Sequence, residues 1–149
     1  EPIKWFYRHP NLKFIQEDIF KLKFSPAHFD LIINCSTIEH IGLVGRYGVT
    51  EPDPDGDIEI MKLLKTILNP NGIMLLTIPV GRDKVFVPLH RVYGQDRLPK
   101  LLEGWKILKK EFWIKDDQNR WICVDESMAL SKDPVEHCYG LGLFILQPL

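Results

Sequence analysis

The sequence predicts an α/β fold whose sheet is mostly parallel and ends in an antiparallel strand pair near the carboxyl terminus. Two apolar runs without polar alternation, Phe29–Cys35 and Ile73–Gly81, are typical of strands that are covered on both faces. The segment between them has the periodicity of an amphipathic helix, so the three form a strand–helix–strand crossover. From residue 105 onward, short strand-like segments are joined by tight turns, which predicts antiparallel pairing.

Length and composition limit the class of protein. A chain of 149 residues is long enough for one domain with a sizeable core, and we expect a single domain over residues 1–149. The chain does not begin with Met, so it is expected to be either processed or a fragment of a longer polypeptide. The net charge of −1 provides no general attraction to nucleic acid or to a membrane surface, and no apolar run approaches the roughly 18 residues of a membrane span.

Cysteine usage indicates a reducing compartment. The three cysteines are odd in number and lack C-x-x-C spacing, which argues against a disulfide framework or a zinc site. We therefore expect a cytoplasmic protein with buried thiols at Cys35, Cys123 and Cys138.

In the first third of the chain, two strands are expected. Leu12–Gln16 is the first, and it ends in the acidic pair Glu17–Asp18. Phe29–Cys35 is the second, and it is expected to bury Leu31, Ile32 and Ile33 completely.

The crossover helix is expected to begin at Asp55 or Asp57 and to end near Leu68, because apolar residues recur there at three- and four-residue spacing. The turn Asn69–Gly72 should end it, since proline cannot continue a helix and Asn and Gly tolerate positive φ. The remaining expected elements are a short helix from Gln95 to Glu103, strands Trp105–Lys115 and Trp121–Val124 around the turn Asp116–Asn119, a loop over Ser131–Glu136, and a final strand Tyr139–Leu146.

Polar clusters follow both apolar strands, at the carboxyl ends where open α/β sheets bind ligands. Glu39 and His40 follow the first strand, and His90 and Arg91 follow the second. Imidazole titrates near neutral pH, so His90 can act as a general base, and Arg91 can grip a carboxylate or phosphate with two nitrogens. The alternative for each cluster is a polar surface loop.

The order of these segments resembles the later two-thirds of a Rossmann-like S-adenosylmethionine-dependent methyltransferase. Asn11–Phe20 resembles the third strand of that family, and Phe29–Ile41 resembles the fourth. Leu68–Gly72 is similar to its Leu-x-Pro-Gly-Gly turn, with Asn71 in place of one glycine. The first strand, the glycine-rich loop and the acidic end of the second strand have no counterpart, so the N-terminal strands of the sheet are expected to be missing.

The missing strands would leave a gap between the family's third and fourth strands. Either Leu12–Gln16 pairs directly with Phe29–Cys35, or another chain fills the gap, or the sequence is part of a longer polypeptide.

The resemblance implies methyl transfer from S-adenosylmethionine to a small-molecule or sugar-like acceptor. It implies two sets of site residues: cofactor-binding Glu17, Asp18, Ile19, Asn34 and Ser36, with Asp18 at the adenine amino group, and catalytic Glu39, His40, His90 and Arg91 at the acceptor. No metal site is expected, because His40, His90 and Glu39 lack any recognised ligand spacing, and a metal-dependent hydrolase is disfavoured for the same reason.

The competing hypothesis is a truncated or degenerate relative without catalysis. Such a chain would act as an interaction subunit, binding a second copy or a partner chain through its exposed sheet edge and through aromatic patches such as Trp5–Tyr7. Binding of the cofactor would separate the two hypotheses.

Overall fold

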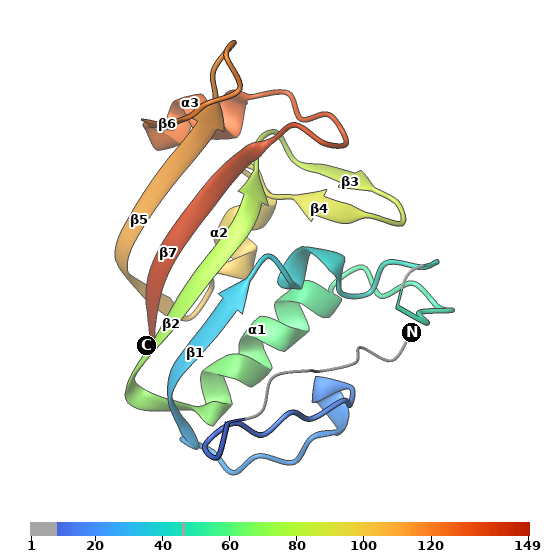
Figure 1. Ribbon diagram of the computed structural model, residues 1–149, viewed down its shortest axis with the longest axis vertical. Coiled ribbons are helices and arrows are strands. Elements are labelled where there is room, and N and C mark those ends of the chain that lie inside the picture. Colours follow the sequence, from blue (N-terminus) through green and yellow to red (C-terminus); the bar gives the residue numbers. More distant parts are fainter. Residues whose placement is uncertain (1–8, 46) are drawn as a thin grey trace.

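The computed structural model describes residues 9–45 and 47–149. Its centre is a five-stranded sheet in the order β1-β2-β7-β5-β6 (Figure 1). The strands of this sheet are β1 (Phe29–Cys35), β2 (Leu68–Val80), β5 (Trp105–Lys115), β6 (Trp121–Val124) and β7 (Gly140–Pro148). A small second sheet pairs β3 (Lys84–Phe86) with β4 (His90–Val92), and the helical elements are η1 (Ile19–Lys21), η2 (Ile38–His40), α1 (Gly56–Ile67), α2 (Arg97–Leu101) and α3 (Glu126–Ser131).

The predicted crossover is confirmed. β1 and β2 run parallel in neighbouring positions, and α1 connects them (Figure 1). Buried α1 residues such as Met61 and Leu64 belong to the same core cluster as Met74, Leu76 and Ile78 of β2. The core therefore lies between the helices and one face of the sheet.

The α/β class is confirmed, but the sheet is less parallel than expected. Among the described residues, β1–β2 is the parallel pair of this sheet, whereas β2–β7, β7–β5 and β5–β6 are antiparallel. The strands β5 and β6 and the strand β7 agree with the predicted hairpin and final strand. The sheet has few parallel strand pairs because, within the described ranges, no further strand pairs with the outer edge of β1.

The expectation of a strand at Leu12–Gln16 is wrong. These residues are irregular and exposed, and they do not pair with β1. The first of the three ways to close the gap is therefore excluded. A short segment with strand propensity forms a strand only when a partner supplies backbone hydrogen bonds.

The expected complete burial of β1 is also wrong. Ile32 is half-buried, but Leu31 and Ile33 are 52% and 68% exposed, because they point to the face of the sheet opposite α1. Cys35 lies on that same side and is exposed, as is Cys123, so the expectation of buried thiols is wrong for these two residues, whereas Cys138 is half-buried.

Other differences are local. α1 begins one residue after Asp55, as predicted, and α2 is a shorter version of the predicted helix. The expected turn Asn69–Gly72 is instead a bulge at the start of β2, where the register jumps from Phe29↔Leu68 to Leu31↔Ile73. The helix α3 and the β3–β4 hairpin were not predicted.

Among the described residues, no helix is long and apolar enough to cross a bilayer. The aromatic patch Trp5–Tyr7 lies outside the described residues.

Candidate active site

The carboxyl end of β1 turns sharply into η2. Ser36 adopts a positive φ of 48°, a strained conformation for a residue with a side chain, and its amide donates to the Thr77 carbonyl of β2 at 3.1 Å. Ile38 then inserts into the core with no exposed surface. These two anchors fix the short helix so that Glu39 and His40 project from a rigid turn.

His40 is held in one tautomer. Its Nδ1 lies 2.5 Å from the carbonyl oxygen of Leu89, and a carbonyl can only accept, so Nδ1 carries the proton. In the neutral ring, Nε2 is then the basic nitrogen. The side chain keeps 22% of its surface exposed, which leaves this nitrogen within reach of a small molecule.

Glu39 lies beside His40 but is almost completely buried. Its Oε1 is 3.8 Å from His40 Nε2, and its Oε2 has no hydrogen-bond partner among the described residues. Burial penalises the charged carboxylate and raises the pKa of Glu39 from 4.5 to about 7, against a smaller lowering by a backbone hydrogen bond. The carboxyl therefore changes protonation state near neutral pH.

His90 lies on the β4 side of the same cluster, as the sequence predicted. Its ring centroid is 6.4 Å from that of His40 and 5.4 Å from that of Phe86, and the His90 side chain is buried. The polar ends of the two crossover strands therefore meet. The β3–β4 hairpin holds this position because Val80, at the end of β2, bridges to Tyr93 beside β4.

Tyr139 completes the cluster and was not predicted. Its ring packs against His90 at 4.8 Å between centroids, and burial and the Glu39 charge raise the pKa of its phenol. The sequence did place Tyr139 at the start of the final strand. A strand that runs antiparallel to its neighbour begins at the edge of the sheet where that neighbour ends. Gly140 pairs with Val80, so the residue before it belongs to the site edge.

Arg91 faces away from this cluster. It is 2% exposed, and its guanidinium donates to the backbone carbonyls of Ile41, Asp53 and Pro54, with Asp57 3.8 Å from its Nε. These contacts hold the loop that follows η2. The predicted grip on a carboxylate or phosphate stays a prediction, and in this conformation the side chain has a positioning role.

Asp57, at the start of α1, is fully buried and forms the centre of this network. Arg97 contacts it through both carboxylate oxygens, at 2.9 and 2.5 Å, and the Tyr93 hydroxyl donates to it at 3.0 Å. Sequence reasoning treated Asp57 only as a helix cap. The partner arginines lie 34 and 40 residues further along the chain, so local pattern carried no signal for the network.

The residues predicted to bind the cofactor fall into two groups. Glu17 and Ile19 line a hollow with Leu31 and Ile32, beside the outer edge of β1. The carboxylate of Asp18 caps η1 by accepting from the Phe20 amide at 3.0 Å.

Asn34 and Ser36 form the second group, at the carboxyl end of β1. The side-chain oxygen of Asn34 is buried and has no hydrogen-bond partner among the described residues, so a donor from a bound molecule would satisfy it. The end of β1 therefore fits part of a polar cofactor. The two groups do not form a single cradle in this structure.

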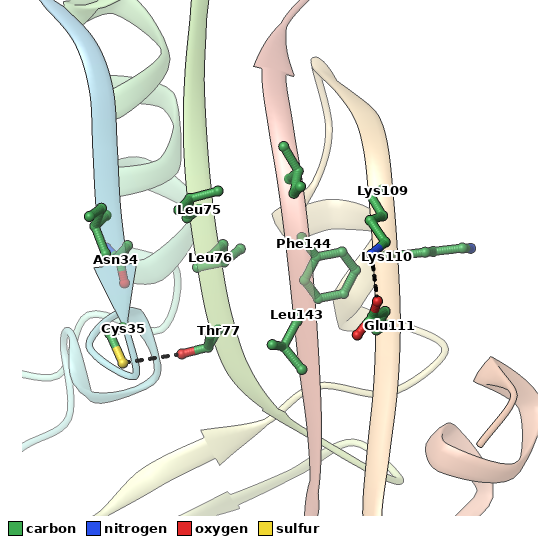
Figure 2. A pocket seen from close by; sticks show the side chains of 12 residues that line it. Asn34, Cys35, Leu75, Leu76, Thr77, Lys109, Lys110, Glu111, Leu143 and Phe144 are labelled. Atoms are coloured by element: carbon green, nitrogen blue, oxygen red, sulfur yellow. Dashed lines mark hydrogen bonds and ion pairs between the residues drawn. The ribbon is translucent and has the colours of Figure 1, made fainter. Parts of the chain in front are cut away.

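Another hollow lies on the uncovered face of the sheet (Figure 2). It has a volume of about 330 Å³ and is lined by mainly apolar residues of β1, β2 and β7 and by the charged β5 residues Lys109, Lys110 and Glu111. Asn34, Cys35 and Thr77 border it at one end, but Glu39, His40 and His90 are not among its lining residues. We take the polar cluster as the candidate active site because it contains the titratable groups.

The fold and the site define an α/β protein with a polar cluster at the carboxyl end of a parallel strand pair. Residues 15–134 match the family described as "Caenorhabditis protein of unknown function, DUF268". The match covers most of the chain, and the chain belongs to this family. No curated protein matches the sequence.

Solved structures show a similar fold at low sequence identity. The PH0226 protein from Pyrococcus horikoshii OT3 has a TM-score of 0.54 and 14% identity, and the match covers 93% of this chain and 60% of that one. A SAM-dependent methyltransferase from Aquifex aeolicus has a TM-score of 0.47 and 15% identity, with 93% and 56% covered. A Leishmania major protein described as a SAM-dependent methyltransferase of the DUF858 family has a TM-score of 0.45 and 15% identity, with 85% and 42% covered.

The chain thus spans about 40–60% of the length of these structures. At such identities the likeness concerns the fold alone, and of these three structures the Pyrococcus protein is the one with a TM-score above 0.5.

Proposed function

We propose that this chain carries the acceptor-activating part of an S-adenosylmethionine-dependent methyl-transfer site. The observation that supports this most is the meeting of Glu39, His40 and His90 at the carboxyl ends of β1 and β2. The order of motifs in the sequence and the fold shared with the Pyrococcus protein agree with it. When bound, S-adenosylmethionine supplies an already activated methyl group, so the protein has to align the acceptor and remove its proton.

His40 is the proton acceptor in this proposal. The Leu89 carbonyl holds the Nδ1 proton, so Nε2 presents its lone pair to a hydroxyl or amine of the acceptor. Glu39 lies 3.8 Å from that nitrogen, and as a carboxylate it stabilises the imidazolium that forms. Because its pKa is about 7, Glu39 can also take over the proton near neutral pH.

The remaining residues shape the place where the acceptor binds. His90, Phe86 and Tyr139 form an aromatic wall beside His40. Flat apolar surface with a few polar atoms suits a small organic molecule, including a sugar-like one. Asn34 and Ser36 are the described residues placed to hold the cofactor end of the site, because Asn34 offers a buried oxygen that needs a donor.

The second candidate function is a non-catalytic interaction subunit. The exposed apolar face of the sheet favours it, since such a surface in a folded protein marks an interaction site. An exposed apolar face is compatible with both functions, so only an assay of methyl transfer distinguishes them.

The test measures transfer of a labelled methyl group from S-adenosylmethionine to a panel of small hydroxyl and amine compounds. We expect transfer by the wild-type chain and a loss of about 10²–10⁴-fold in His40→Gln, the typical contribution of a general base. His28→Gln is the matched control, because His28 is exposed and contacts Phe24 and Phe29, away from the cluster. Absence of transfer by the wild type, or equal transfer by His40→Gln, would contradict the proposal and leave the interaction subunit.

A further inference from the structure

The candidate active site contains a buried carboxyl group whose hydrogen bonds are incomplete. Glu39 is 2% exposed, and its Oε2 atom has no hydrogen-bond partner among the described residues. Its Oε1 atom lies 3.8 Å from His40 Nε2, which is too far for a hydrogen bond between these two atoms. A buried polar atom without a partner destabilises a folded chain, so we expect this site to bind a group that donates hydrogen bonds.

The two neighbouring side chains offer lone pairs and not hydrogens. His40 Nδ1 donates its proton to the Leu89 carbonyl, so Nε2 is left as an acceptor. An ionised Glu39 can also only accept. A ligand atom therefore satisfies both side chains only if it carries at least two hydrogens.

The spacing of these two acceptors distinguishes an amine from an alcohol. Two atoms 3.8 Å apart can both lie about 2.9 Å from a single nitrogen, which is the usual length of such a hydrogen bond. A primary ammonium group carries three hydrogens, so it can donate to Glu39 Oε1 and to His40 Nε2 together. A hydroxyl group carries one hydrogen and leaves one of the two acceptors without a donor.

The charge of the site also favours an ammonium group. Among the described residues, no lysine or arginine forms an ion pair with Glu39, and Arg91 is directed to the backbone carbonyls of Ile41 and Asp53. Burial is the main cause of the raised pKa of Glu39, so its carboxylate form lacks a compensating charge. A cationic ligand would supply that charge, whereas a ligand carboxylate or phosphate would be repelled by it.

Aromatic rings form the wall of the site. The rings of Phe86 and Tyr139 lie 5.4 and 4.8 Å from that of His90, measured between centroids. Aromatic faces attract cations and pack against apolar carbon, and the ammonium of the exposed Lys84, 4.7 Å from the Phe86 centroid, shows this attraction within the chain. An ammonium group attached to an apolar ring would match this wall.

We propose that the methyl acceptor is a small-molecule amine, bound as an ammonium group between the Glu39 carboxylate and His40 Nε2, with its apolar part against the aromatic wall. The role as acceptor rests on the proposed function, whereas binding of the ammonium group does not require methyl transfer.

The transfer to an amine then needs one proton to leave before the new bond forms. The ammonium passes this proton to His40 Nε2, which frees the lone pair on the ligand nitrogen. The nitrogen–methyl bond forms while the methyl–sulfur bond of the donor breaks, and the electron pair of that bond goes to sulfur. The product leaves as an N-methylammonium ion, and His40 releases its proton to water.

The test compares two ligands of the same shape, benzylamine and benzyl alcohol, in NMR titrations that follow the backbone amides of residues 38–41. At pH 8 most of Glu39 is ionised, because its pKa is about 7. We expect the wild-type chain to bind benzylamine at least about tenfold more tightly than benzyl alcohol. In Glu39→Gln, which keeps the shape of the side chain without its charge, this preference should fall below about twofold.

His28→Gln is the matched control and should keep the preference, since His28 is exposed and contacts Phe24 and Phe29. Circular dichroism verifies that both variants fold. The inference is overturned if the wild type binds the two ligands equally, if neither ligand gives a saturable shift, or if the preference persists in Glu39→Gln.

The labelled-methyl assay separates this inference from the proposed function. Transfer to benzyl alcohol that is at least as fast as transfer to benzylamine would refute the amine acceptor and leave methyl transfer in place. Selective binding of benzylamine without any transfer would refute methyl transfer and leave the ammonium-binding site in place.

Discussion

Glu39 and His40 are neighbours in sequence but have different environments, and this difference gives the site its chemistry. Ile38 anchors the turn in the core, so Glu39 is pulled out of water while His40 keeps part of its ring exposed. Burial brings the carboxyl pKa to about 7, so Glu39 changes protonation state near neutral pH. A carboxyl that titrates near neutral pH beside an imidazole nitrogen is suited to general base catalysis.

The Glu39 pKa predicts a pH dependence of stability. Since the folded-state pKa of about 7 exceeds the usual value of 4.5, folding favours the protonated carboxyl. The contribution is fully present below pH 4.5 and is lost as the pH rises through 7, by about 3 kcal/mol at most. Urea unfolding at pH 5 and pH 8 should show this loss in the wild type and not in Glu39→Gln, which mimics the protonated form. If the free energy of unfolding of the wild type and of Glu39→Gln changed equally between pH 5 and pH 8, the burial of the Glu39 carboxyl would be contradicted.

The Asp57 network predicts a second residue-scale effect. Asp57→Asn removes a buried charge that faces Arg91 and Arg97, so Arg91 loses the carboxylate beside it and Arg97 keeps only its contact with the exposed Asp55. Breaking a buried pair in this way costs about 3–5 kcal/mol. Chemical denaturation should reveal it, with Asp55→Asn as the control.

Asp55 is suited to that comparison because its side chain is 67% exposed and meets Arg97 only at 3.4 Å. Its replacement should change the free energy of unfolding by less than about 1 kcal/mol. An equal decrease in the free energy of unfolding in Asp57→Asn and Asp55→Asn would show that the buried charge of Asp57 does not stabilise the fold.

At the scale of elements, most of the strand–helix–strand crossover could be predicted from the sequence. The structure of the N-terminal region before β1 could not. The helix α1 and the strands β5, β6 and β7 follow local periodicity, which is a property of the segment itself. The strand state of Leu12–Gln16 and the burial of Leu31 and Ile33 depend on what lies beside them. An apolar run indicates that a surface needs cover, but it does not say whether the same chain supplies the cover.

The candidate site was predictable to the same extent. The proximity of Glu39, His40 and His90 could be predicted because parallel strands open their carboxyl ends to one edge, whereas their catalytic role stays a prediction. Tyr139 was missed because it comes from the start of an antiparallel strand, and the contacts of Arg91 with backbone carbonyls depend on a loop conformation that has no sequence signature.

The amphipathic character of α1 gives the prediction that belongs to this scale. Met61 is 1% exposed against the sheet, whereas the next residue, Lys62, points to solvent and pairs with Glu59 on the surface. Met61→Ala should lower the free energy of unfolding by about 2–5 kcal/mol, and Lys62→Ala should change it by less than about 0.5 kcal/mol. Similar effects at the two positions in a denaturant titration would argue against the packing of α1 on β2.

For the whole molecule, two parts of the sheet differ in composition. The carboxyl edge gathers titratable groups from η2, from β4 and from the residue before β7, whereas the face opposite α1 presents mainly apolar side chains of β1, β2 and β7. The proposed methyl-transfer site therefore lies apart from the apolar hollow on the sheet face, which Glu39, His40 and His90 do not line.

Heteronuclear NMR, following backbone amides during a titration with S-adenosylhomocysteine, tests the central claim most directly. The claim is that the ends of β1 and β2 form one ligand site around His40. It predicts saturable shifts at the amides of residues 34–40 and at His90, with little change at the exposed β6 strand. No saturable shift at millimolar ligand, or shifts confined to residues 17–21 of the separate hollow, would contradict it.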